Sequence, residues 1–192
     1  MKNNRNGQSA VITDTDYSKI RKQIKSRKYK LLLDLAWYTG ERWGALVQLQ
    51  VDDVYDAEGK PREFINFRAR TRKATPDGKR KTRQVPVHPV LRESLLGYQP
   101  EAGAWMFPDR EGDQAISLRW GDMILRCAVD KAGLSAKGIS THSTRRSFIT
   151  KLAKRGVSLA TIKKATGHTD LKVLSRYIEV TDDDVKEAIA TL

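Results

Sequence analysis

The chain has 192 residues and a formal net charge of +13, from 36 Lys and Arg against 23 Asp and Glu. A chain of this length forms one domain or two small ones, and 39% hydrophobic residues suffice for a core. Its one cysteine, Cys127, excludes an internal disulfide and a multi-cysteine metal site, and favours a reducing compartment. The apolar run at residues 31–37 is too short to span a bilayer, which takes about 20 apolar residues.

The first half of the chain shows helical apolar spacing three times and then the pattern of two strands. Thr13 and Asp16 form a capping-box pattern that opens the first helix, and Gly40 is placed to end the second. Helices are expected from residue 13, over 31–38 and over 42–49, and strands over 64–67 and 83–87. The turn signal at residues 76–78 lies between the strands, so we expect an antiparallel hairpin.

In the second half of the chain the residue pattern predicts helices, apart from a turn-rich stretch at residues 100–113. These helices are expected over 89–96, 117–132, 140–155, 158–167, 170–177 and 182–192. Capping residues open several of them and glycines end them. The elements together indicate an α+β, mainly helical fold: one compact domain over residues 13–192 with a small antiparallel sheet, and residues 1–12 as an N-terminal extension.

Positive charge is concentrated between Lys60 and Arg83, where ten residues are basic and two are acidic. A concentrated excess suits a polyanion such as a nucleic-acid backbone, whereas a solvated loop with a run of charges is the plainer interpretation. Composition alone leaves both interpretations open. The residues expected to contact double-stranded DNA are Arg68, Arg70, Arg72, Lys79, Arg80, Lys81 and Arg83.

Three short motifs carry candidate catalytic residues, and each motif is weak alone. Residues 39–42, Thr-Gly-Glu-Arg, also fit a helix end followed by a solvated arginine. His142 and Arg145 lie three positions apart and so share one face of a helix, as on many surface helices. His168 is followed nine positions later by Tyr177, and a tyrosine near a helix end is more often part of the core.

Taken together and in this order, the motifs resemble the catalytic domain of the tyrosine recombinases, the phage-integrase family. The family pattern is T-G-x-R, a lysine on a β-hairpin before a V-P strand, H-x-x-R, and L-G-H followed by a tyrosine. The matching residues are Thr39 to Arg42, Lys73 ahead of Val85-Pro86, His142 to Arg145, Thr166 to His168, and Tyr177. The resemblance covers roughly residues 13–192. It implies a site-specific recombinase or integrase that cleaves and rejoins DNA strands through a 3′-phosphotyrosyl intermediate, with no metal and no cofactor.

The resemblance implies that three residues act directly on the phosphate. Arg42 and Arg145 would stabilise the negative charge that develops on the phosphate oxygens, for which paired guanidinium groups are suited. Tyr177 would be the nucleophile, because a phenol can hold the phosphate covalently until the strand is rejoined.

The remaining catalytic roles implied by the resemblance concern protons. Lys73 would be the general acid that protonates the leaving 5′ oxygen, with Lys79 and Lys81 on the same hairpin as alternatives. His142 would take or orient the tyrosine proton, and His168 would donate a hydrogen bond to a phosphate oxygen.

Two features depart from the family pattern. The family usually carries Glu or Asp three residues after the first arginine, where this chain has Ala45. We therefore expect a less rigid site, or one supported by another residue. The family also has a separate core-binding domain before the catalytic domain, whereas only residues 1–12 precede the first predicted helix here. The chain is accordingly either a fragment or a single-domain member.

The last predicted helix, residues 182–192, has an apolar face that includes Val185 and Ile189. In the tyrosine recombinases, which this chain resembles, such a tail docks on a neighbouring protomer. The resemblance therefore implies self-association on DNA. Packing of this helix on its own domain is the alternative. For a DNA-acting enzyme with no membrane partner, the resemblance implies a cytoplasmic, nucleoid-associated location.

Two other functions remain open at this point. Residues 156–177 fit a helix-turn-helix, which would make the chain a DNA-binding regulator without chemistry. A catalytically decayed family member is the second alternative, and Ala45 lends it some support. The three histidines and one cysteine predict no metal site. We expect Cys127 to be a buried thiol and His88 to have a role in a turn.

Overall fold

The computed structural model describes residues 9–190 except for residues 73, 75–77, 79, 169, 171–173 and 176–181. Residues 183, 184, 187 and 188 are described by their backbone alone. The described residues fall into two compact units, Met1–Phe148 and Ile149–Leu192. Helices dominate both, and the sheet has two strands, which confirms the predicted α+β, mainly helical class.

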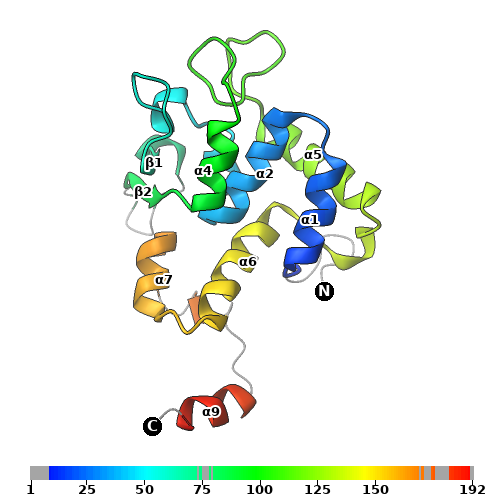
Figure 1. The fold of residues 1–192 in the computed structure, drawn as a ribbon, viewed down its shortest axis with the longest axis vertical. Coiled ribbons are helices and arrows are strands. Elements are labelled where there is room, and N and C mark those ends of the chain that lie inside the picture. Colours follow the sequence, from blue (N-terminus) through cyan, green and yellow to red (C-terminus); the bar gives the residue numbers. More distant parts are fainter. Residues whose placement is uncertain are drawn as a thin grey trace. The chain divides into compact units, whose positions relative to one another are not determined.

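The first unit consists of helices gathered beside the small sheet (Figure 1). Its helices are α1 (Asp14–Gln23), α2 (Arg27–Thr39), α3 (Trp43–Leu46), α4 (Pro89–Leu96), α5 (Leu118–Lys131) and the start of α6 (Thr141–Lys154). Its strands are β1 (Phe64–Phe67) and β2 (Arg83–Pro86), and short 3-10 turns lie at Val51–Asp53, Ala69–Thr71 and Ser135–Lys137.

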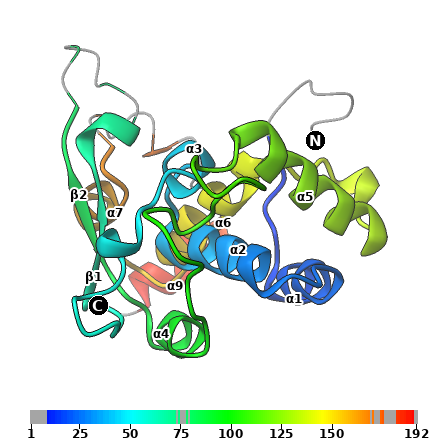
Figure 2. The same ribbon diagram turned by 90° about the horizontal axis from the view of Figure 1, so that it is seen from above.

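Helix α2 forms the centre of this unit, and every residue from Leu31 to Trp37 is buried. A helix that is apolar on all sides belongs in a core, and Figure 2 shows α2 between α1 and α4. The charged residue in this run, Asp34, accepts hydrogen bonds from Arg21 at 2.7 and 2.8 Å and from the Tyr17 hydroxyl at 2.6 Å. A buried carboxylate is tolerated here because its oxygens are paired.

The helix ends follow the capping signals in the sequence. Thr13 and Asp16 form the reciprocal capping box at the start of α1, and Gly40, with φ of 60°, ends α2. His88 acts as the N-cap of α4, because its Nδ1 accepts from the Val90 amide at 3.2 Å. The turn role expected for His88 is therefore a helix cap.

The two strands form the predicted antiparallel hairpin. Ile65 pairs with Val85 and Phe67 with Arg83, and all four side chains are buried. The turn residues 75–77 lie outside the described residues. Burial of an arginine at the end of a strand requires a charged partner, which the site provides.

Two details of the first unit differ from the sequence prediction. Helix α3 was expected to reach residue 49 but ends at Leu46, where the chain turns and the Leu49 amide bonds to the Leu46 carbonyl at 3.2 Å. Cys127 was expected to be buried but is exposed. It shares a solvent-facing stripe of α5 with Met123, whereas Leu125 on another face joins the core.

The second unit contains the end of α6, α7 (Leu159–Thr166) and α9 (Asp182–Ile189). Ser158 caps α7, and Gly167, with φ of 66°, ends it as predicted. The helix expected at 170–177 lies mostly outside the described residues. Within that range, Leu174 and Ser175 are described and are helical. Throughout the described part of the chain, every helix is too short or too polar to cross a membrane.

Candidate active site

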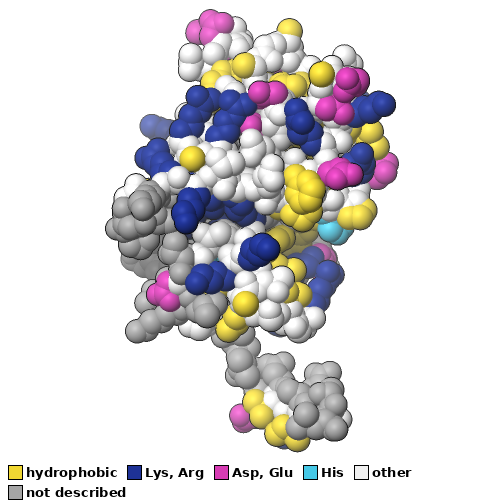
Figure 3. Space-filling view, turned by 90° about the vertical axis from the view of Figure 1, so that its left-hand side faces the viewer, with side chains coloured by type: hydrophobic (Ala, Val, Ile, Leu, Met, Phe, Trp, Pro, Cys, Tyr) yellow, Lys and Arg dark blue, Asp and Glu magenta, His cyan; other side chains and the backbone are white. Residues whose placement is uncertain are grey.

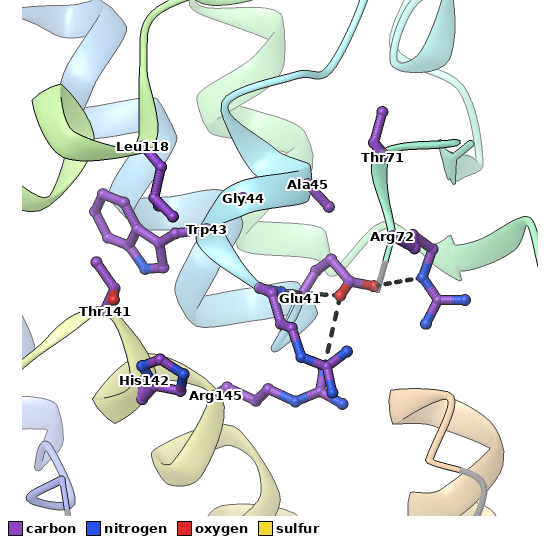
Figure 4. Close-up of a pocket in the computed structure, with 11 residues that line it drawn as sticks. Glu41, Trp43, Gly44, Ala45, Thr71, Arg72, Leu118, Thr141, His142 and Arg145 are labelled. Carbon is purple, nitrogen blue, oxygen red and sulfur yellow. Dashed lines mark hydrogen bonds and ion pairs between the residues drawn. The ribbon is translucent and has the colours of Figure 1, made fainter. Parts of the chain in front are cut away.

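A pocket of about 210 Å³ opens in the first unit where α3, the turn after β1 and the start of α6 meet (Figure 4). Three of the predicted catalytic residues line it, namely Arg42, His142 and Arg145. Arg42 is the N-cap residue of α3, and the other two stand one turn apart at the beginning of α6. The fold thus brings together residues that lie about 100 positions apart, as the Arg145 to Gly40 bond over 105 positions illustrates.

The local backbone fixes the place of Arg42. Its carbonyl accepts from the amides of Ala45 at 2.9 Å and Leu46 at 3.1 Å, which closes the single turn of α3. Its own amide donates to Oε1 of Glu41 at 2.9 Å. The side chain is half-buried and lines the pocket.

Gly40, which ends α2, lies in close contact with α6. A Cβ at this position would lie 2.6 Å from Cγ of Phe148, closer than real side chains approach. The Gly40 carbonyl accepts from Nη1 of Arg145 at 2.8 Å. Because Gly40 has no side chain, the two segments approach closely enough for its backbone carbonyl to hold the guanidinium of Arg145.

Trp43 anchors α3 to the same region of α6. Its Nε1 donates to Oγ1 of Thr144 at 3.1 Å, and both groups are buried. A Cβ at Gly121 of α5 would lie 3.2 Å from the indole ring, so α5 also packs closely on Trp43. The indole thus fixes the distance between Arg42, which precedes it, and Arg145, which follows Thr144.

Glu41 lies at the centre of the arginine cluster, with 1% of its surface exposed. Its Oε2 accepts from Nη1 of Arg83 at 2.6 Å and lies 3.4 Å from Nε of Arg72. Its Oε1 lies 3.8 Å from Nη1 of Arg145 (Figure 4). Burial raises the pKa of Glu41, but the charges of these arginines and the amide of Arg42 outweigh burial and hold the pKa below its ordinary value.

Sequence reasoning did not assign a role to Glu41, although it lies inside the T-G-x-R motif. The sequence held one indication that another carboxylate was needed. Ala45 stands where the family usually carries Glu or Asp, and it is buried and lines the pocket without offering a charge. The carboxylate that contacts Arg72, Arg83 and Arg145 belongs instead to Glu41, the residue before Arg42.

The structure corrects the prediction that Arg83 contacts DNA. Arg83 is 6% exposed, donates to Glu41, and donates from Nη2 to the Thr39 carbonyl at 3.1 Å. A guanidinium buried in these contacts stabilises the hairpin against α2 and does not lie on the surface. Arg72 is also largely covered, with 9% of its side chain exposed, and it lines the pocket.

The other predicted DNA contacts differ in exposure. Arg68 bonds to Asp52 at 2.6 Å and to Asp53 at 2.7 Å, so nearby carboxylates balance its charge. Arg70, Arg80 and Lys81 are exposed, and Figure 3, which looks onto the side of the sheet, shows Lys and Arg side chains gathered there. Lys73 and Lys79 lie outside the described residues.

Two predicted catalytic residues belong to the second unit. His168 follows the end of α7, and its Nδ1 lies 2.6 Å from Oγ1 of Thr166, which fixes the orientation of the ring. Tyr177 lies outside the described residues. Across the described residues, no three His, Cys, Asp or Glu side chains are grouped in a way that could hold a metal ion.

Comparisons with known sequences point to a single family. The model of the Phage integrase family matches residues 10–184. A tyrosine recombinase XerC-like protein of Caldanaerobacter subterraneus is 26% identical over 95% of the chain and 53% of its own length. Tyrosine recombinase XerD of Corynebacterium glutamicum is 27% identical over 82% of the chain and 50% of its own length. The chain spans about half the length of the curated relatives it matches.

Solved structures share the fold. The XerA recombinase superposes with a TM-score of 0.74 at 18% identity, covering 96% of this chain and 66% of that one. The catalytic domain of bacteriophage HP1 integrase gives a TM-score of 0.62 at 18% identity, covering 95% of both chains. XerH recombinase bound to its difH substrate gives 0.71 at 20% identity, covering 98% of this chain and 55% of that one.

Proposed function

The chain belongs to the phage integrase family, and on that premise we propose that it is a site-specific DNA recombinase or integrase. It would cleave and rejoin DNA strands through a 3′-phosphotyrosyl intermediate. The observation that carries the proposal is the pocket in which Arg42, His142 and Arg145 converge from distant segments. The alternative of a DNA-binding regulator gives no reason for such a pocket.

The arginines would act on the transition state. When a nucleophile attacks a phosphodiester, negative charge grows on the non-bridging oxygens, and fixed positive charge lowers the barrier most where water is excluded. Arg145 is 4% exposed and held by the Gly40 carbonyl, so its guanidinium is oriented before the substrate arrives. Arg42 is half-buried at the same pocket and would bind a second oxygen.

Tyr177 would supply the nucleophile. Its phenolic oxygen would form a bond to phosphorus while the bond from phosphorus to the 5′ oxygen breaks, leaving a 3′-phosphotyrosine and a free 5′ hydroxyl. Lys73 would give the proton to the 5′ oxygen, and His142 would take or orient the phenol proton. His168 would donate to a phosphate oxygen. Attack of a 5′ hydroxyl on the phosphotyrosine reverses these steps and rejoins the strand, so no external energy source is needed.

Double-stranded DNA would be the partner. The exposed cations Arg70, Arg80 and Lys81 would contact backbone phosphates without reading sequence. The XerH relative was solved bound to difH substrate, and a lambda integrase relative was solved as a dimer bound to a core site. Activity on DNA would place the chain in the cytoplasm, in association with the nucleoid.

Self-association on DNA is part of the same proposal. In helix α9 the side chains of Val185 and Ile189 are 46% and 63% exposed, respectively. A helix of this length buries too little surface for a stable dimer by itself. We therefore expect the segment at 182–192 to join protomers only when DNA holds them together.

A covalent trapping experiment tests the proposed function. The full chain is incubated with a pool of duplexes that carry a nick and a randomised centre, so that the released strand diffuses away and the adduct accumulates. For the wild type we expect a slowly migrating, protease-sensitive DNA band on a denaturing gel. Tyr177→Phe should still bind DNA and give no such band. DNA binding without an adduct from the wild type would support a regulator or a decayed family member instead.

A further inference from the structure

We infer that Glu41 is a positioning residue whose buried carboxylate holds the guanidinium groups of the pocket and ties the β1–β2 hairpin to the catalytic Arg145. The inference rests on the proposed function, because it gives Glu41 a part in the same strand cleavage. It assigns a role to a side chain that would not touch the DNA.

The two carboxylate oxygens of Glu41 face different parts of the fold. Oε1 accepts from the amide of Arg42 at 2.9 Å and lies 3.8 Å from Nη1 of Arg145. Oε2 accepts from Nη1 of Arg83 at 2.6 Å and lies 3.4 Å from Nε of Arg72. One side chain therefore connects α3, α6 and both sides of the hairpin.

The charges explain why this connection matters. Three guanidinium groups placed around one point would repel one another strongly in a region of low dielectric constant. The carboxylate of Glu41 balances part of that repulsion, and because it is 1% exposed, water screens the interaction weakly. Without it, Arg72, Arg83 and Arg145 would move apart or draw water into the pocket.

The contacts also exclude a direct catalytic role for Glu41. Both of its oxygens already meet donors, and its side chain is covered. A carboxylate in contact with the DNA phosphate would also oppose binding through like charge. Three guanidinium groups, those of Arg72, Arg83 and Arg145, surround this one carboxylate, and the side chain of Arg42 lines the same pocket, so positive charge remains for the phosphate.

The connection to the hairpin reaches the region of the proposed general acid. Arg72 lies 3.4 Å from Glu41 at its Nε and donates from Nη1 to the Lys81 carbonyl at 2.8 Å. Arg72 directly precedes Lys73 in the sequence. By holding Arg72, Glu41 fixes the start of the segment that carries Lys73, as well as Arg145 on the opposite side.

The test compares single-turnover cleavage with DNA affinity and folding stability. In Glu41→Gln the charge is lost while the size is kept, and we expect the adduct to form about 10²-fold more slowly at saturating DNA, because misplaced groups cost rates of this order. The dissociation constant for DNA should change by only a few fold. Glu41→Asp keeps the charge but shortens the side chain, and we expect a smaller loss of rate. If Glu41→Gln does not fold, the cleavage rate of Glu41→Asp tests the inference in its place.

Asp16→Asn provides the matched control. Asp16 is also a buried carboxylate, 4% exposed and bonded to Lys137 at 2.8 Å, but it lies outside the pocket. Its loss should lower the melting temperature and leave the cleavage rate at the wild-type value. If Asp16→Asn slows cleavage as much as Glu41→Gln at a similar melting temperature, then Glu41 contributes stability alone and the inference is wrong.

A second variant tests rescue. Ala45 lines the same pocket, so Glu41→Gln combined with Ala45→Glu returns a carboxylate from the neighbouring turn. We expect this pair to recover a large part of the rate. A double variant as slow as Glu41→Gln would overturn the view that a carboxylate at this place is what the cluster requires.

Nitrogen-15 spectra of the arginine side chains separate this inference from the proposed function. In the wild type, the guanidinium signals of Arg83 and Arg145 should show restricted rotation, which is lost in Glu41→Gln and retained in Asp16→Asn. Unchanged signals in Glu41→Gln would overturn the inference even if the wild type cleaves DNA. If the wild type forms no adduct, the proposed function fails, and these spectra still decide whether Glu41 orders the arginines.

Discussion

Gly40 and Phe148 are in such close contact that a Cβ added to Gly40 would lie 2.6 Å from Cγ of the phenyl ring. The backbone at Gly40 has φ of 60°, a conformation that residues with a side chain rarely adopt. The contact holds the end of α2 against α6, where the Gly40 carbonyl receives the guanidinium of Arg145 at 2.8 Å. Packing of the core and orientation of the Arg145 side chain therefore depend on the same glycine.

Substitution of Gly40 should lower the free energy of unfolding. Gly40→Ala adds backbone strain of about 1–2 kcal/mol and overpacking of about 1–3 kcal/mol to the folded state. Gly59→Ala is the control, because Gly59 has φ of 74° but open space around it, so strain is its main cost. Urea unfolding should show a larger loss of stability for Gly40→Ala. Equal losses would mean that the close packing against Phe148 contributes nothing.

The stability contributed by Glu41 should depend on pH in a defined direction. Its pKa is below the ordinary 4.5 in the folded chain, so the carboxylate stabilises the fold fully above that pH. The contribution is lost as the pH falls through the lower pKa of the folded state. The stability difference between wild type and Glu41→Gln should therefore be large at pH 7 and shrink below about pH 4. A difference that stays constant from pH 7 to pH 3 would contradict this.

Removal of either pocket arginine should slow cleavage far more than it weakens binding. Arg42→Ala and Arg145→Ala each remove a donor proposed to act in the transition state, and the loss of such a donor typically lowers the rate about 10²–10³-fold. Arg126→Ala is the control, since Arg126 lies on the surface of α5 in a pair with Asp122. Single-turnover adduct formation at saturating DNA measures the effect. A near-normal rate in either pocket variant would remove that arginine from its proposed role.

The exposed cations of the hairpin should govern the salt dependence of DNA binding. Arg70, Arg80 and Lys81 changed together to alanine should weaken binding to all sequences. The slope of log affinity against log salt should become shallower by up to about 0.9 for each DNA phosphate that the protein no longer neutralises. The control changes Lys19, Lys22 and Lys25, which are exposed on or just after α1. Figures 1 and 2 both place α1 away from the sheet. Equal effects of the two triple variants would show that total charge, not this surface, determines binding.

Local signals predicted most of the fold. Capping residues such as Thr13 and Ser158 act on the nearest turn, so the sequence alone locates the helix that each begins. The spacing of His142 and Arg145 likewise places both on one face of α6 without any tertiary information. Cys127 was misplaced because helical spacing gives the direction of a side chain relative to its own helix and not which neighbour covers it.

The arrangement inside the site could be predicted only in part. Arg83 and Glu41 are 42 positions apart, and no local pattern joins them. One signal was present: Arg83 lies two residues before the buried Val85, so both side chains point to the same face of β2. That alternation favours burial of Arg83 over contact with DNA. The carboxylate that such a buried arginine requires could be identified only once the fold placed Glu41 beside it.

The proposed strand cleavage is decided by identifying the amino acid that becomes attached to DNA. The trapped adduct is digested with trypsin and nuclease, and the peptide carrying the residual nucleotide is sequenced by tandem mass spectrometry. We expect a peptide that contains Tyr177, modified on its phenolic oxygen and linked to the 3′ end of the cleaved strand. A linkage to another residue, or to the 5′ end, would contradict it.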